Sequence, residues 1–306
     1  MSAQLTLSRA AIKAAEALSP RLGAAVALPL FMHVGARLPV RADERATHES
    51  ARRSRIRVGA KEVAVYEWGA GARTVLLVHG WRGRAAQFAA LVRELRAEGY
   101  LVVGFDAPAN GDSEGRRTSI LDYVDAIGNL QRRHGGFHAI VGHSVGVLAA
   151  LVAVNEGVQA GRVAGIAGVS DSDWLVEGFA APLALRQDTV DALRERFARR
   201  IFPGERDIFD RFSAVRHPLP ARVPLLLVHD DADARVPVSE SRRLLVANHG
   251  HAELITTEGL GHTRILNADT TLDAVTEFVN ASSGKSAPIF PTLHSTMLTP
   301  PVDTVP

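Results

Sequence analysis

The most informative absence in this chain of 306 residues is cysteine, which does not occur at all. Disulfide bridges and cysteine-ligated metal sites are therefore excluded, and the sequence carries no sign of the redox state of its compartment. A strong charge imbalance is also missing, because 35 Lys and Arg residues are interleaved with 33 Asp and Glu residues, for a formal net charge of +2. Since there is no concentrated basic stripe, we expect no nucleic-acid partner.

Long apolar runs are missing as well. None reaches the roughly 18–20 residues that span a bilayer, and the nearest approach is LGAAVALPLFMHVGA, residues 22–36. A signal peptide would use Lys13 and Arg21 as its basic region, but the long preceding segment and Glu16 within it argue against export. The alternatives are a helix pair packed on the domain and peripheral contact with a membrane surface. We expect a cytoplasmic protein without an integral membrane span.

What the chain does have is enough apolar residues, 46%, for a large core. From about residue 56, short runs rich in Val, Leu and Ile alternate with longer amphipathic stretches. This alternation predicts an α/β fold, with a mostly parallel central sheet covered by helices on both faces. The expected strands are residues 62–68, 74–79, 101–105, 139–142, 163–169, 224–229 and 253–257.

Three regions fall outside this alternation. Residues 1–56 are expected to form an N-terminal helical segment before an α/β domain at residues 57–281. Within that domain, residues 170–222 lack a strand pattern and carry apolar residues at helical spacing, which predicts an inserted helical cap over the strand ends. The tail, residues 282–306, is rich in Pro, Ser and Thr and is expected to lack fixed structure.

The pentapeptide GHSVG, residues 142–146, lies between an expected strand and a helical run. It matches the Gly-x-Ser-x-Gly pattern in which a sharp turn presents a nucleophilic serine, here Ser144. The alternative is a crowded strand–helix junction that needs small residues. If Ser144 is the nucleophile, the amide of Val145 at a helix N-terminus can donate to a developing oxyanion. His143 is interpreted as a packing or pocket residue, not as a catalyst.

A serine hydroxyl needs a base, because it is a weak nucleophile when free. His262 follows the last expected strand, and the glycines beside it permit a turn that aims the ring over the sheet. Between Ser144 and His262 lies HDDADARVP, whose aspartates at 230, 231 and 233 are candidates to orient the histidine. A solvated turn or a capping role suits the first two of these better. Asp171 follows the expected strand at residues 163–169, the first one after GHSVG, and is a further candidate.

The chain resembles the α/β-hydrolase superfamily across about residues 57–281. Besides GHSVG, the resemblance is carried by LLVHGWRG (residues 76–83), GFDAPANGDSEG (104–115) and HDDADARVP (229–237). It implies the α/β-hydrolase fold, a second oxyanion amide from Trp81, and Asp233 as the triad acid. Asp230 stands where the family usually has glycine, so Asp230 remains the alternative acid.

The function implied by this resemblance is serine hydrolysis of an ester through Ser144, Asp233 and His262. We expect small to medium apolar acyl groups, bound in a pocket that includes Trp81, His143, Trp174 and Phe179. The same triad also serves thioesterases and C–C bond hydrolases, and the fold also serves as a non-catalytic small-molecule binding module. No cluster of His, Asp and Glu has metal-ligand spacing, so we expect neither a metal nor a cofactor.

Overall fold

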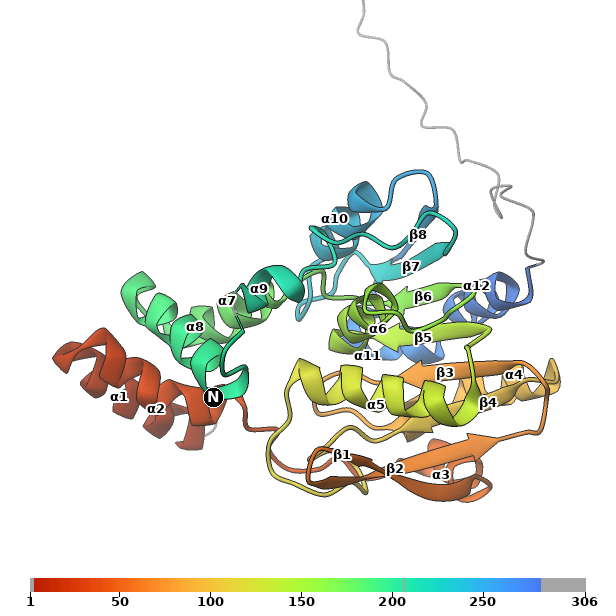
Figure 1. Cartoon of the computed structure of the whole chain (residues 1–306), viewed down its shortest axis with the longest axis horizontal. Helices are drawn as coiled ribbons and strands as arrows, with labels where there is room; N and C mark the ends of the chain where they lie inside the picture. The colour runs from red at the N-terminus through yellow and green to blue at the C-terminus, as the bar shows by residue number, and fades with distance from the viewer. Residues whose placement is uncertain (1–2, 206, 282–306) are drawn as a thin grey trace, which may run out of the picture.

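The computed structural model describes residues 3–205 and 207–281, so the expected tail at 282–306 lies outside the described residues. Within them, an eight-stranded sheet has the order β1-β2-β4-β3-β5-β6-β7-β8 (Figure 1). β2 pairs antiparallel with β1 and β4, and the pairs from β4 to β8 are parallel. The strands are β1 (Arg52–Val58), β2 (Lys61–Trp68), β3 (Thr74–Val78), β4 (Leu101–Phe105), β5 (Ala139–His143), β6 (Val163–Ile166), β7 (Leu225–Asp230) and β8 (Ala252–Thr257).

The predicted α/β architecture, a mostly parallel sheet covered by helices on both faces, is confirmed. The seven expected strands lie within a few residues of their predicted positions, and β4 spans the predicted residues. β1 was not predicted, and it begins at Arg52, inside the segment expected to be helical. Its sequence, RRSRIRV, is charged because an edge strand faces solvent, where positive side chains also discourage pairing with another chain.

Helices cover both faces of the sheet, and each face has its own apolar core (Figure 1). One face carries α5 (Ile120–His134), α6 (Val145–Asn155) and α10 (Ser239–Ala247). The other carries α3 (Ala42–Glu49), α4 (Ala89–Ala97) and α12 (Asp269–Asn280), with the short elements η1 (Ala85–Phe88), α11 (Gly261–Arg264) and η2 (Ile265–Asn267). α6 is apolar on all sides and almost wholly buried, as expected for a helix in the centre of a core.

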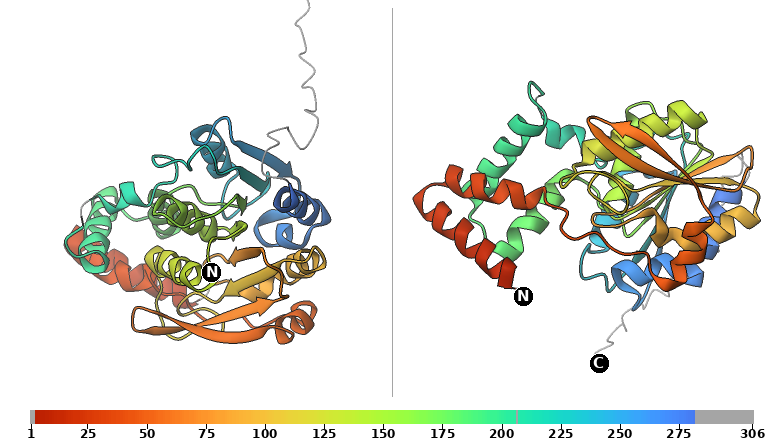
Figure 2. Two further views of the ribbon diagram at one scale, coloured as in Figure 1. Left: turned by 45° about the vertical axis from the view of Figure 1, so that its right-hand side comes forward. Right: turned by 90° about the horizontal axis from the view of Figure 1, so that it is seen from below.

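The predicted cap region contains α7 (Ser172–Leu183), α8 (Gln187–Ile201) and α9 (Ile208–Arg211). The N-terminal helices α1 (Ala3–Leu18) and α2 (Pro20–Phe31) lie beside these cap helices, at one end of the molecule (Figures 1 and 2). α1, α2, α7, α8 and α9 together are called the helical lobe. α1 leads away from the sheet and α2 returns toward it, so the C-terminal end of α2 is on the inner side of the lobe (Figure 2). The expected helix pair therefore packs on the cap.

The outer side of this pair is exposed. Leu18, Leu22 and Val26 have 79%, 49% and 43% of their surface accessible. In the part of the chain that the structure describes, no helix is both long and apolar enough to cross a bilayer.

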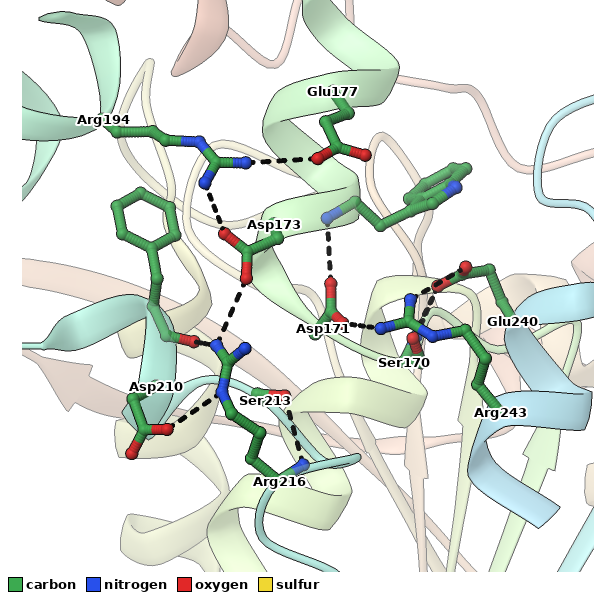
Figure 3. A network of polar contacts seen from close by, with 12 residues as sticks. Ser170, Asp171, Asp173, Glu177, Arg194, Asp210, Ser213, Arg216, Glu240 and Arg243 are labelled. Atoms are coloured by element: carbon green, nitrogen blue, oxygen red, sulfur yellow. Dashed lines mark hydrogen bonds and ion pairs between the residues drawn. The ribbon is translucent and has the colours of Figure 1, made fainter. Parts of the chain in front are cut away.

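A network of charged side chains joins the start of the cap to the sheet domain (Figure 3). Asp171 accepts a hydrogen bond from the Trp174 amide at 2.9 Å, capping α7, and pairs with Arg243 of α10 at 2.5 Å. Arg243 also pairs with Glu240, and the other carboxylate oxygen of Glu240 accepts from the Ser170 hydroxyl at 2.6 Å. Since Asp171, Glu240 and Ser170 are buried, these contacts fix the chain where it leaves β6 and enters the cap.

Candidate active site

The predicted site residues follow the carboxyl ends of strands that lie close together in the sheet. Trp81 follows β3, Ser144 follows β5, Asp233 follows β7 and His262 follows β8. These strands are parallel and have the order β3-β5-β6-β7-β8. Because the carboxyl ends of parallel strands lie at one edge of the sheet, residues separated by up to 181 positions in the chain meet there. Ligands of other α/β sheets also bind at this edge.

Ser144 lies on a sharp turn between β5 and α6, with φ 56° and ψ −124°, a backbone conformation that is unfavourable for a residue with a side chain. Neighbouring backbone holds it there, since the Ser144 amide donates to Ile166 at 3.0 Å. Glycine is required at Gly146, where a Cβ would lie 2.2 Å from the Val78 carbonyl oxygen. The junction is therefore crowded, and the crowding leaves Ser144 facing the cavity described below.

The Gly80–Trp81 peptide is held in one orientation. The Gly80 carbonyl accepts from His79 Nδ1 at 2.7 Å and from the Tyr123 hydroxyl at 3.2 Å. His79 Nε2 accepts from the Ala107 amide at 2.9 Å, which leaves Nδ1 as the donor. Burial lowers the pKa of His79, so the neutral ring needed for this arrangement is favoured. Since the carbonyl and N–H of a trans peptide point in opposite directions, the Trp81 N–H is turned away from His79 and Tyr123.

Two backbone amides at the cavity are available as donors. Val145 is the first residue of α6, where an N–H has no partner within the helix. Neither the Val145 nor the Trp81 amide makes a backbone hydrogen bond within the described residues, and both residues line the cavity. This is the placement expected of an oxyanion hole, with Gly80 so close to Ser144 that a Cβ on Gly80 would lie 2.8 Å from the serine Cβ.

His262 is held by Asp233. The Nδ1 atom of His262 lies 2.7 Å from Asp233 Oδ2, and the aspartate is buried. Burial alone would raise the pKa of Asp233, but hydrogen bonds from His229 and His262 and from the Val236 and Arg235 amides hold it well below its usual range. Asp233 therefore stays ionised and holds the His262 ring through Nδ1, so that Nε2 is the ring nitrogen not bound to the aspartate.

Within the described residues, none of the other three candidate acids, Asp230, Asp231 and Asp171, makes a hydrogen bond or ion pair with the His262 side chain. Asp231 is exposed. Asp230 is buried rather than solvated, and its carboxylate accepts from the Thr257 hydroxyl and the Leu260 amide, both at 2.9 Å. It therefore braces the turn that carries His262. Asp171 caps α7 and pairs with Arg243, as described above, which places it in the cap junction.

Ser144 and His262 line the same cavity, but the described residues include no hydrogen bond between the serine hydroxyl and the histidine. Such contacts are often long without substrate and shorten when it binds. His143 supports the backbone of His262, because His143 Nε2 donates a hydrogen bond to the His262 carbonyl oxygen at 2.9 Å. Burial and the neighbouring His262 lower the pKa of His143 to about 3, so it stays neutral.

The cavity has a volume of about 860 Å³. The predicted pocket residues Trp81, His143, Trp174 and Phe179 all line it. The cavity is also lined by a larger group of residues that the sequence did not indicate, on the N-terminal segment and on the later cap helices. These are Phe31, Met32, Leu38, Phe197, Phe209 and Phe212. The only local signal was their apolar character, because α2 and the cap are separated by about 140 residues and no spacing rule connects them.

The residues that the structure describes contain no group of three His, Asp or Glu side chains able to hold a metal ion. The groups that the structure brings to the cavity are a serine hydroxyl, a histidine paired with an ionised aspartate, and two backbone amides.

The sequence matches a model of the alpha/beta hydrolase family over residues 75–275. Among solved structures, an esterase from Pyrococcus furiosus is similar, with a TM-score of 0.59 and 19% identity over 80% of this chain and 97% of that one. Alpha/beta hydrolase domain-containing protein 10 from mouse has a TM-score of 0.59 and 18% identity, covering 75% and 97%. A monoacylglycerol lipase from Paleococcus ferrophilus has 0.54 and 22%, covering 71% and 98%. At these identities the likeness concerns the fold alone, and no curated protein matches this chain.

Proposed function

The chain belongs to the alpha/beta hydrolase family, and from this premise we propose that it is a serine hydrolase that cleaves carboxylic esters of apolar acids through Ser144, His262 and Asp233. The observation that carries the proposal is the 2.7 Å contact between Asp233 and His262, whose ring lines the same cavity as the serine of the strained turn. An aspartate–histidine pair beside a serine on a strained turn is the arrangement that activates a hydroxyl.

In the first half of the reaction, His262 Nε2 takes the Ser144 proton while the serine oxygen attacks the acyl carbonyl carbon. The tetrahedral oxyanion accepts hydrogen bonds from the Trp81 and Val145 amides. Its collapse breaks the bond to the leaving alcohol, which receives the proton from His262 and leaves an acyl-serine. Removing one donor of this kind from such a site costs about 10²–10³ in kcat, so the two amides supply a large share of the rate.

In the second half, a water molecule gives a proton to His262 and attacks the acyl-serine. The same amides stabilise the second oxyanion, the carboxylic acid leaves, and the proton returns to Ser144. Throughout, the ionised Asp233 favours the positively charged histidine that forms in each half. His143 acts as a positioning residue, because its hydrogen bond holds the backbone of His262.

The direct test is labelling with a fluorophosphonate, which reacts with activated serines, together with turnover of nitrophenyl esters. We expect the wild-type protein to be labelled and to hydrolyse esters, and Ser144→Ala to lose both, with a fall in kcat of about 10⁶. The matched control is Ser239→Ala, an exposed serine at the start of α10 that does not line the cavity.

Unchanged labelling or turnover in Ser144→Ala would show that another residue is the nucleophile. If wild-type protein that is folded by circular dichroism is neither labelled nor active, the binding-module alternative replaces the proposal. A panel with matched oxygen esters and thioesters separates the esterase from the thioesterase alternative, since both use the same triad.

A further inference from the structure

We propose that the N-terminal helix α2 forms the far wall of the acyl pocket and makes the site selective for acyl chains of about ten carbons or more. This inference rests on the proposed function and names its substrate class. It extends the small to medium acyl groups expected from the sequence, and it assigns a specificity role to a segment outside the family match at residues 75–275.

The wall that α2 and the cap form is aromatic. Phe31, the last residue of α2, lines the cavity together with Phe179 of α7 and Phe197 of α8. The Phe31 ring centroid lies 5.2 Å from that of Phe179 and 5.5 Å from that of Phe197, both in edge-to-face geometry. Aromatic pairs at such distances are favourable beyond their buried area, so the N-terminal helix and the cap form one continuous apolar surface.

α2 is also fixed against the cap in its N-terminal half, where it packs on α8. Gly23 lies so close to α8 that a Cβ there would be 3.0 Å from Thr189 and 3.1 Å from the backbone of Glu16. The buried Glu16 carboxylate of α1 accepts from the Arg186 amide at 2.8 Å, at the start of α8, and from Lys13. The helix pair is thus attached to the cap by close packing and by a buried acceptor, which keeps Phe31 in the wall.

The cavity has room for a long acyl chain. A cavity of 860 Å³ lies near the upper end of the range of small-molecule pockets, about 300–1,000 Å³. A short acyl group leaves most of this aromatic-lined space to water. Each additional buried CH₂ favours binding by up to about fourfold, equivalent to about 0.8 kcal/mol. If half of this free energy is realised for each of the six additional CH₂ groups, kcat/KM is about 60-fold higher for a decanoyl ester than for a butyryl ester.

The test changes the size of Phe31 in both directions. Phe31→Trp shortens the pocket, and we expect it to lower kcat/KM for nitrophenyl decanoate about tenfold relative to the butyrate. Phe31→Leu enlarges the pocket, and we expect it to move the preferred ester toward longer chains. The matched control is Val26→Ala on the exposed outer side of the same helix, which should leave the decanoate-to-butyrate ratio unchanged.

The inference is overturned if both Phe31 variants are folded and keep the wild-type chain-length profile, or if Val26→Ala shifts the profile as much as they do. Displacement of cis-parinaric acid by decanoate, measured on the Ser144→Ala background, tests the pocket without turnover. If no ester is cleaved but this probe binds and Phe31→Trp weakens it about tenfold, the acyl pocket stands and the proposed hydrolysis fails. If the probe does not bind and Phe31→Trp alters nothing, the pocket assignment fails whether or not esters are cleaved.

Discussion

The turn at Ser144 and the helical lobe are built in different ways. At the turn, backbone meets backbone: a Cβ on Gly146 would lie 2.2 Å from the Val78 carbonyl oxygen, and one on Gly80 would lie 2.8 Å from Ser144. In the lobe, side chains from distant segments meet, as Phe31, Phe179 and Phe197 do, and the outer side is open to solvent. Backbone contacts leave no room for adjustment, whereas side chains adjust by changing rotamer or volume.

This difference assigns different tasks to the two regions. Chemistry depends on atoms placed to within about 0.5 Å, which the glycine-packed turn and the edge of the sheet supply. Selection among acyl groups depends on the volume and polarity of a wall, which a helical lobe supplies. Substitutions near the turn should therefore change the rate for every substrate, and substitutions in the lobe should change preference or stability.

The largest effect on this comparison is expected from Asp230, at the end of β7, and Asp233, in the loop that follows. Asp233→Asn removes the charge beside His262 and should lower kcat by about 10⁴ for all esters. Asp230→Asn should lower kcat less than tenfold and instead reduce the free energy of unfolding by about 1–3 kcal/mol, because a buried acceptor of several hydrogen bonds is weakened. Steady-state kinetics and urea unfolding check both, and a larger rate loss in Asp230→Asn would reverse the assignment.

A second, smaller effect tests the lack of room at the turn. Gly80→Ala brings a methyl group against Ser144 and His143, and the resulting shift should lower kcat by about 10² without a change in chain-length preference. Gly128→Ala is the control, since Gly128 is inside α5 and its Cβ would meet only the end of Arg132 at 3.8 Å. It should keep full activity and gain about 0.5–1 kcal/mol of stability. Equal kinetics in both variants would mean that the turn is not tightly constrained.

Substitutions in the charged network between the cap and the sheet domain should lower stability more than activity. Arg243→Met leaves the buried Asp171 and Glu240 without their shared cation, so we expect a loss of about 2 kcal/mol in the free energy of unfolding (Figure 3). Arg242→Met is the neighbouring control, because its partner Asp231 is exposed and such pairs contribute about 0–1 kcal/mol. Chemical denaturation of the two variants measures the difference, and equal losses would show that the buried network does not hold the cap.

The smallest effect concerns the attachment of the N-terminal helices. Burial would raise the pKa of Glu16, but hydrogen bonds from Lys13 and the Arg186 amide hold it below its usual value. A carboxylate with a lowered pKa in the folded state stabilises the protein above about pH 4.5, and this contribution is lost as pH falls through the folded-state pKa. Glu16→Gln should therefore cost about 1–2 kcal/mol at pH 7, and the difference from wild type should narrow below pH 4.5.

Thermal unfolding at pH 7, 5, 4 and 3.5 follows this difference. Glu177→Gln, an exposed glutamate of α7, should match the wild type at every pH. A cost for Glu16→Gln that stays constant down to pH 3.5 would contradict the role given to the charge.

The same contrast explains what the sequence could predict. Strands in the centre of the sheet were predictable because continuous apolar runs are buried on both faces. Ser144 was indicated by the Gly-x-Ser-x-Gly pattern and His262 by its place after the last expected strand, whereas Asp233 was chosen through the family resemblance. β1 was missed because a charged edge strand has no apolar pattern. The bracing role of Asp230 was missed because its partners lie on another part of the chain, Thr257 at the end of β8 and Leu260 in the turn after it.

The lobe was predictable only in part. The spacing of apolar residues predicted helices at both the N-terminus and the cap, since amphipathic patterns are local. That α2 and α8 pack on each other, and that Phe31 meets Phe197, depends on contacts across more than 160 residues. No local pattern encodes such a pairing, because the hydrophobic effect is non-directional and does not specify which apolar surface a helix packs on.

The bond between Glu16 and the Arg186 amide spans 170 positions of the chain, and this has a consequence for how the protein folds. At synthesis rates of about 5–20 residues per second, α8 follows α1 by roughly 10–30 s. Helices as short as α1 and α2 are marginal in water by themselves, and the surfaces of this pair that pack on α8 have no native partner during that interval. Contacts of such long sequence separation also form slowly. The part of the pocket wall on α2 is therefore synthesised well before its partners in the cap and is among the last to reach its native contacts.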